Sequence, residues 1–121
     1  MPLAAQFGMV TESYYALASG FLTGKYRSAG DIAANAARGE AAQRYLTPEG
    51  LAVVDALADV AGAAGASPAS VAIAWQLAKG VGSPVASARV PSQLVALFAA
   101  IDLKLDAEQV AALDAASAPF A

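Results

Sequence analysis

The sequence predicts an α/β fold that is mostly helical, with two short parallel strands and about four helices in 121 residues. Two short apolar runs are typical of strands in a parallel sheet that is covered on both faces. Around them, proline and glycine mark helix starts and stops. The composition is 58% hydrophobic and rich in alanine, which favours helices but buries little area per residue. We expect a single partial domain over 1–121, with a strand over 9–14, a long connection over 15–46 that holds a short helix near 31–38, helices over about 48–64 and 68–79, a strand over 83–87, and helices over about 91–100 and 106–116.

The first strand contains one residue that does not suit a buried strand. Glu12 shares a face with Tyr14, because side chains alternate along a strand. A buried carboxylate without a partner is costly. We therefore expect either a partner for Glu12 or a face of the sheet that is not packed.

The connection over 15–46 begins with two glycines and a basic residue. The chain is expected to turn at Gly20 and Gly24 and then present Lys25. Glycine lets a backbone approach a ligand closely, and a lysine ammonium suits phosphate. A P-loop is excluded, because that motif needs a longer spacing between its glycines and Ser or Thr after the lysine. Long connections of this kind are usually functional or mobile.

The helix starts carry specific cap signals. Thr47 and Ser67 each precede a proline, which pairs a good N-cap with the residue best suited to the first helical position. Asp106 is followed by Gln109 at the spacing of a capping box. Gly65 is a natural helix stop. These signals predict where three of the helices begin.

The composition excludes several classes of protein. The net charge is −3, so nucleic acid is not an expected partner. The chain has no histidine and no cysteine, which excludes disulfides, thiolate metal sites and Ser-His or Cys-His nucleophiles. The lack of cysteine fits a cytoplasmic protein. No apolar run approaches the roughly 20 residues that span a bilayer, so no membrane partner is expected.

Four segments resemble one enzyme family in order and spacing. They are residues 14–27 (Tyr-Tyr-Ala-Leu-Ala-Ser-Gly-Phe-Leu-Thr-Gly-Lys-Tyr-Arg), 67–75 (Ser-Pro-Ala-Ser-Val-Ala-Ile-Ala-Trp), 83–94 (Ser-Pro-Val-Ala-Ser-Ala-Arg-Val-Pro-Ser-Gln-Leu) and 102–114 (Asp-Leu-Lys-Leu-Asp-Ala-Glu-Gln-Val-Ala-Ala-Leu-Asp). The chain resembles the aldo-keto reductases, nicotinamide-dependent (β/α)8-barrel enzymes, from about the seventh strand to the end. The resemblance implies a C-terminal segment of a TIM barrel. Since such a barrel needs about 250 residues, this chain is not expected to close one alone.

The resemblance implies one wall of an NADP(H) site. Tyr14 matches the aromatic residue that stacks on the nicotinamide ring, and a flat apolar face suits that role. The loop that wraps the pyrophosphate is matched by Tyr15, Leu17, Ser19 and Gly20. The residues also allow simpler interpretations. The alternative for Tyr14 and Leu17 is an ordinary core, and for Ser19 and Gly20 it is a turn.

Basic and polar residues extend the implied site. Lys25 matches a basic residue that closes over the pyrophosphate. Arg89 and Gln93 match the region around the adenosine 2′-phosphate, which implies NADP(H) over NAD(H). A solvated cation at a helix start is the alternative for Arg89. The chain departs from the family where a Glu-Asn pair reads the adenine, since Ala96 and Leu97 stand there.

The implied activity is reduction of an aldehyde or ketone by hydride transfer from NADPH. The family's catalytic Asp-Tyr-Lys-His group belongs to the first half of the barrel, and this chain contains no histidine. We therefore expect no catalytic residue here, no activity of the chain alone, and weak or absent cofactor binding. A split gene, a truncation or a mis-called start would each produce such a chain.

The alternative function is a stand-alone helical binding or assembly module. Two strands leave unpaired edges, and apolar helix faces lack partners. One such face is the stripe of Leu94, Leu97, Phe98 and Ile101. On this basis we expect self-association.

Overall fold

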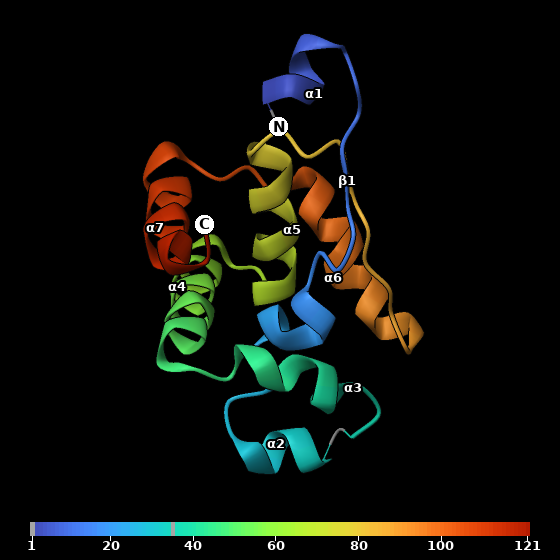
Figure 1. Cartoon of the computed structure of the whole chain (residues 1–121), viewed down its shortest axis with the longest axis vertical. Coiled ribbons are helices and arrows are strands. Elements are labelled where there is room, and N and C mark those ends of the chain that lie inside the picture. Colours follow the sequence, from blue (N-terminus) through green and yellow to red (C-terminus); the bar gives the residue numbers. More distant parts are fainter. Residues whose placement is uncertain (1, 35) are drawn as a thin grey trace.

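The computed structural model describes residues 2–34 and 36–121. The described residues are mostly helical, with one parallel pair of strands, as predicted (Figure 1). In chain order the elements are α1 (Pro2–Gln6), β1 (Glu12–Ser13), the 3₁₀ helix η1 (Ala18–Thr23), α2 (Ala29–Ala34), α3 (Ala36–Ala42), η2 (Gln43–Tyr45), α4 (Pro48–Ala64), α5 (Pro68–Ala78), β2 (Ser83–Pro84), α6 (Pro91–Asp102), α7 (Ala107–Ser117) and η3 (Ala118–Phe120).

Helix α5 lies at the centre of the molecule. It packs against α4 and α7 on one side and against α6, β2 and η1 on the other (Figure 1). The main core joins α4, α5 and α7. It contains Val53 and Leu57 of α4, Val71 of α5 and Leu113 of α7. A second, smaller cluster places Ala16, Ile73 and Ala100 between the start of η1, α5 and α6. Because α5 contributes to both clusters, it connects the two sides of the fold.

The helix caps explain the observed starts. Thr47 Oγ1 accepts a hydrogen bond from the Gly50 backbone N–H at 3.0 Å, and Ser67 Oγ accepts from the Ser70 N–H at 3.2 Å. Asp106 and Gln109 form the predicted capping box. These local signals place α4, α5 and α7 close to the predicted ranges. Helix α6 extends beyond its predicted end, to Asp102.

Both predicted strands are too long. The ladder contains only two residues from each strand, with Glu12 paired to Ser83 and Ser13 to Pro84. Pro84 has no N–H to donate, but the donors that face β1 are Ser83 and Val85, so the proline affects only the outer edge of β2. At the other strand, the chain leaves the extended conformation at Tyr15, whose φ is 58°. The predictions over 9–14 and 83–87 are therefore wrong in length, although their parallel pairing is correct.

Backbone contacts outside the ladder hold the two segments together. The N–H of Ser83 donates to the carbonyl of Thr11 at 3.0 Å, and the N–H of Val85 donates to the carbonyl of Ser13 at 3.0 Å. The N–H of Ala16 then donates back to the carbonyl of Val85 at 3.3 Å. Glu12 is exposed, so its carboxylate avoids the cost of burial and its face of the sheet is not packed.

The prediction of a connection over 15–46 is also wrong, since η1, α2, α3 and η2 occupy much of it. Alanine favours the helical conformation, and in α2 and α3 this preference exceeds the destabilising effect of Gly30 and Gly39 on a helix. The expected helix near 31–38 is divided between α2 and α3, and residue 35 between them lies outside the described residues. These helices enclose a core of Phe21, Tyr26, Ala42 and Val54.

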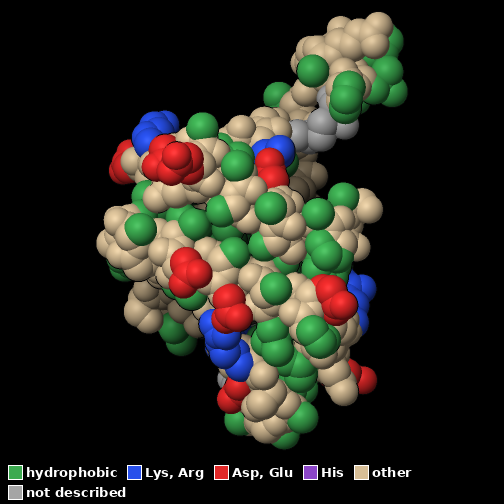
Figure 2. Space-filling model, turned by 90° about the vertical axis from the view of Figure 1, so that its left-hand side faces the viewer, with side chains coloured by type: hydrophobic (Ala, Val, Ile, Leu, Met, Phe, Trp, Pro, Cys, Tyr) green, Lys and Arg blue, Asp and Glu red, His purple; other side chains and the backbone are tan. Residues whose placement is uncertain are grey.

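Helix α1 and one face of α6 lie apart from these cores. No residue of α1 is buried, and the segment projects from the rest of the chain (Figures 1 and 2). On α6, only Ala100 is buried, whereas Phe98 and Ile101 are 64% and 63% exposed. The predicted apolar stripe of α6 therefore faces solvent over much of its length.

The described residues show no feature of a membrane span formed by one helix or of a metal site. None of the helices there is by itself long and apolar enough to cross a bilayer, and α4 and α5, bent by 96° at their junction, reach that length and composition only when taken together. The described part of the chain also holds no group of three or more acidic side chains that would bind a metal ion.

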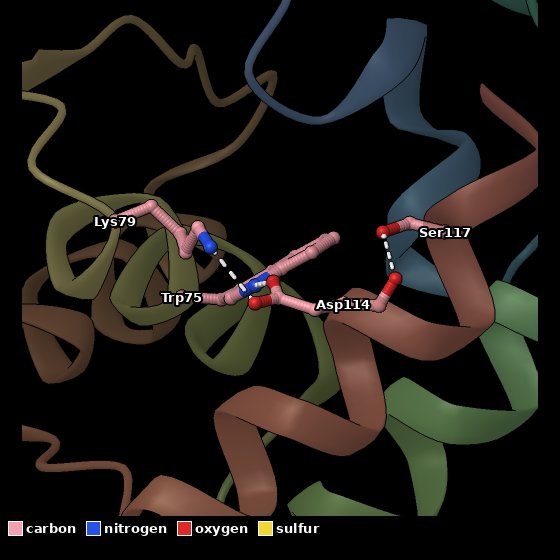
Figure 3. A network of polar contacts seen from close by, with 4 residues as sticks. All are labelled: Trp75, Lys79, Asp114 and Ser117. Carbon is pink, nitrogen blue, oxygen red and sulfur yellow. Dashed lines mark hydrogen bonds and ion pairs between the residues drawn. The ribbon is translucent and has the colours of Figure 1, made fainter. Parts of the chain in front are cut away.

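Asp114 connects α5 to α7 (Figure 3). The indole N–H of Trp75 donates to its Oδ1 at 2.9 Å, and Lys79 Nζ lies 2.8 Å from its Oδ2. The bond from Lys79, followed by that from Trp75, holds the pKa of Asp114 below its ordinary value of 3.8. Trp75 is the only tryptophan, so its fluorescence reports on this contact.

We predict that Gly50→Ala destabilises the fold, whereas Gly62→Ala on the same helix stabilises it. A Cβ at Gly50 would collide with the carbonyl oxygen of Tyr45, and it would meet nothing within 4 Å at Gly62. The expected changes are a loss of about 1–3 kcal/mol at position 50 and a gain of about 0.5–1 kcal/mol at position 62. Urea unfolding followed by circular dichroism measures both. A change of the same sign in the free energy of unfolding of both variants would contradict the proposed collision at position 50.

Asp114→Asn should reduce stability in a pH-dependent way. A carboxyl group whose folded pKa is lowered stabilises the protein above its unfolded pKa and loses that effect as the pH falls through the folded value. The difference in Tm between the original chain and the variant should therefore be largest near neutral pH. It should shrink between about pH 5 and pH 2. Asp59→Asn, on the exposed face of α4, is the control. A difference that does not change with pH would rule out the ion pair as its source.

Candidate functional site

One pocket of about 680 Å³ lies among the end of β1, η1, the start of α5 and the segment between β2 and α6. Its volume falls within the range of about 300–1,000 Å³ that is typical of small-molecule sites. The described residues that line it are Tyr14, Tyr15, Ala16, Leu17, Ser19, Gly20, Thr23, Lys25, Ala41, Ser67, Pro68, Ala69, Val85, Ala86, Ser87, Gln93, Ala96 and Leu97.

The pocket gathers most of the site residues suggested by the sequence. Those that line it are Tyr14, Tyr15, Leu17, Ser19, Gly20, Lys25 and Gln93. They come from segments about 70 residues apart in the chain, which only the fold brings together. Arg89 is the exception, because it is exposed and does not line the pocket.

Two tyrosines stand at the edge of the pocket. The ring centroids of Tyr14 and Tyr15 are 4.2 Å apart, with a tilt of 43° between the ring planes. Their residues are 76% and 57% exposed, so the core interpretation of Tyr14 is wrong. A hydrogen bond between the side chains of Tyr14 and Tyr15 raises the pKa of Tyr14, because it favours the protonated phenol. Exposed aromatic faces beside a pocket can stack on a flat ligand and be buried by it.

The backbone after these tyrosines is strained. Tyr15, Ala18 and Ser19 have φ values of 58°, 49° and 59°, in the left-handed region that residues other than glycine rarely adopt. Each such residue costs of the order of 1–3 kcal/mol and persists only where its surroundings hold it. Strain of this kind concentrates at ligand sites, and two of these residues, Tyr15 and Ser19, line the pocket.

Gly20 makes room for Lys25. A Cβ at Gly20 would lie 3.1 Å from Cε and 3.3 Å from Nζ of Lys25, and the φ of 90° at Gly20 also suits glycine. The ammonium of Lys25 lies 5.1 Å from the centroid of the Tyr26 ring. The lysine side chain thus extends along the glycine backbone beside the pocket.

The charge of the pocket is positive. Lys25 is the single charged residue among the described residues that line it, and no carboxylate joins it there. Two other cations are paired with carboxylates outside the pocket, since Arg27 lies 2.6 Å from Asp55 and Lys79 lies 2.8 Å from Asp114. The start of α5 lines the same pocket and adds the positive end of a helix dipole. These features favour an anionic ligand.

The opposite wall comes from the segment before α6 and from α6 itself. Gln93 Oε1 accepts a hydrogen bond from the backbone N–H of Arg89 at 2.7 Å, which closes the turn that leads into the helix. Ala96 and Leu97 add an apolar surface. Ser70, which is buried in α5, donates from Oγ to the carbonyl of Ala96 at 2.6 Å and so fixes the distance between the two helices.

Sequence reasoning did not identify several lining residues, among them Thr23, Ser67 and Ser87. Thr23 Oγ1 donates to the carbonyl of Gly20 at 2.7 Å, a contact that stabilises the turn. Ser67 was recognised only as a helix cap. The pattern Ser-Pro indicates where a helix begins, but it does not indicate what the start of that helix faces.

Two comparisons with known proteins bear on this site. No curated protein matches the chain. The family model described as "Aldo/keto reductase family" matches residues 1–118, nearly the whole chain. With this match, the chain belongs to the aldo/keto reductase family.

Proposed function

We propose that this chain forms the NADP(H)-binding wall of an aldo/keto reductase. The observation that carries the proposal is the pocket, which combines exposed aromatic rings, an unpaired lysine and a glycine turn at one place. Its donor set fits a dinucleotide, which needs a flat surface for a ring and positive charge for phosphates. When bound, NADPH would supply the hydride for reduction of an aldehyde or ketone.

The residues of the pocket divide between the two chemical parts of the cofactor. Tyr14 offers an aromatic face to the nicotinamide ring, and Tyr15, which the resemblance assigns to the pyrophosphate loop, adds a second ring 4.2 Å from it. Ser19, Gly20 and Lys25 serve the pyrophosphate, because the glycine admits a close approach and the ammonium neutralises charge. Leu17 packs against the main core and supports this loop from behind.

The preference for NADP(H) over NAD(H) rests on Arg89. Its side chain is exposed beside the pocket, and its backbone is held by Gln93, which does line the pocket. A guanidinium forms paired hydrogen bonds with a phosphate, and the 2′-phosphate is present in NADP(H) only. Binding would bring this exposed side chain onto the ligand.

We further propose that the chain is inactive by itself. The family's proton donor is a tyrosine supported by aspartate, lysine and histidine, and this chain has no histidine. Tyr26 is buried, whereas Tyr14 and Tyr15 are assigned to the cofactor. Catalysis would therefore need the Asp-Tyr-Lys-His group from the first half of the barrel.

NADPH titration followed by ¹H–¹⁵N NMR tests the cofactor site. We expect saturable binding to the isolated chain with a Kd of about 1 mM, weak because the rest of the barrel does not preorganise the pocket. Lys25→Met should weaken binding about tenfold by removing the cation from the pocket, and NADH should bind less tightly than NADPH. Lys104→Met is the matched control, since Lys104 is exposed and does not line the pocket.

Two results would contradict this proposal. Absence of any spectral change up to about 10 mM NADPH would show that the isolated chain has no cofactor site. An equal loss of NADPH affinity in Lys25→Met and Lys104→Met would show that the overall charge of the chain, and not the pocket, attracts the cofactor. Carbonyl reduction by the purified chain would overturn the proposal of inactivity.

A binding or assembly role is the second candidate, and the exposed face of α6 favours it. Val95, Phe98 and Ile101 are 70%, 64% and 63% exposed, and on α1 Leu3 is 66% exposed. Apolar surface of this kind usually marks an interaction site. In the described part of the chain the sheet has only two strands, so the outer edge of β1 adds a second surface on which another strand could pair.

We predict that the chain self-associates through α6. Multi-angle light scattering should show a mass that rises with concentration, and the double variant Phe98→Gln, Ile101→Gln should reduce the association. Leu3→Gln on α1 makes the same kind of change at another exposed site and is the control. A monomer that stays compact at all concentrations would rule out self-association. An equal effect of the control would place the interface outside α6.

A further inference from the structure

We infer that Gln76 is the residue that positions Tyr14 and Tyr15 for a flat ligand. Gln76 lies on α5, outside the pocket, and is half-buried. It is a positioning residue, because it acts on the aromatic pair through the backbone on either side of it. The part of this inference that concerns the cofactor rests on the proposed function.

The side chain of Gln76 contacts both ends of the tyrosine pair. Its Oε1 accepts a hydrogen bond from Ser13 Oγ at 2.7 Å. Its Nε2 donates to the carbonyl of Ala16 at 2.7 Å. Ser13 immediately precedes Tyr14, and Ala16 immediately follows Tyr15. One amide group therefore holds the residue before the pair and the residue after it.

Val85 holds the same two residues from the other side. Its N–H donates to the carbonyl of Ser13 at 3.0 Å, and its carbonyl accepts from the N–H of Ala16 at 3.3 Å. The backbone between Ser13 and Ala16 is thus fixed at both ends by two independent elements. The tyrosine side chains between these fixed points remain free to contact a ligand.

The chemistry of the contact requires an amide. A glutamine offers an acceptor and two donors, and here it uses the acceptor for a hydroxyl and its donors for the carbonyls of Ala16 and Ala72. A carboxylate would have no donor for either carbonyl, and an aliphatic side chain would form none of these bonds. Within α5, the bond to Ala72 at 3.3 Å also holds the amide in its orientation.

The strained backbone gives this contact its importance. Tyr15 has a φ of 58°, and such a conformation persists only where neighbouring contacts enforce it. Ala16, which is 5% exposed, supplies the carbonyl that Gln76 holds directly after this residue. Without that bond, the chain after Tyr15 is released to relax, and the two rings lose their fixed positions.

Amide hydrogen exchange of the ligand-free chain tests the positioning role. Gln76→Met removes the three hydrogen bonds at nearly constant length. We expect exchange at the Ala16 amide to accelerate at least tenfold more than global unfolding accounts for, with shifted NMR signals of Tyr14 and Tyr15. Val60→Ala on α4, which lowers stability through the core alone, should leave these local signals unchanged.

Ser13→Ala provides a second, milder variant. It removes one of the bonds to Gln76 and keeps the bond to Ala16. We expect a smaller change than for Gln76→Met, and little further change when the two substitutions are combined, because both act on one contact. Additive effects, or an acceleration in Gln76→Met no larger than in Val60→Ala, would overturn the positioning role.

NADPH titration of the same variants tests the link to the cofactor. Gln76→Met should raise the Kd about tenfold, whereas Val60→Ala should not change it. If the original chain does not bind NADPH, the proposed cofactor site fails, while the exchange data on Gln76 are still interpretable. If Gln76→Met loosens the tyrosines but keeps the original affinity, the link between Gln76 and the ligand is wrong.

Discussion

Helix α5 determines the arrangement of this chain, because adjacent residues of it hold opposite sides of the fold. Trp75 donates to Asp114 on α7, and Gln76 bonds to Ser13 and Ala16 beside the strand. An apolar helix between two layers could slide or rotate with little cost. Directed hydrogen bonds to both layers remove that freedom, because each of them fixes the rotation of the helix. The pocket depends on this constraint, since the start of α5 forms part of its wall.

Helix α5 also holds the β1 segment in place, a role that neighbouring strands usually have in a sheet. A two-stranded ladder is marginal by itself, and the ladder here is short. Side-chain bonds from Gln76 add to the backbone bonds of Val85 at the same residues, Ser13 and Ala16. The strained turn at Tyr15 is therefore held without long strands.

The features that could be predicted from the sequence are those with local causes. Thr47, Ser67 and Asp106 each act within one turn of their own helix, so the starts of α4, α5 and α7 follow from a few residues. The lengths of the strands could not be predicted, since a ladder depends on a partner far away in the chain. Most of the proposed site residues share one pocket, but Arg89 lies outside it. The hydrogen bond that turns its backbone comes from Gln93, a contact that spacing alone does not reveal.

The arrangement also bears on how further strands would join this chain. The inner edges of β1 and β2 are bonded to each other, so additional strands could pair only with their outer edges. Gln76 bonds to the side-chain hydroxyl of Ser13 and to the carbonyl of Ala16, which lies after the ladder. Its bonds therefore leave the backbone groups on the outer edge of β1 available. Pairing at that edge would therefore leave the tyrosine wall as it is. The tyrosine wall of the pocket is thus a local property of α5 and the segment it holds.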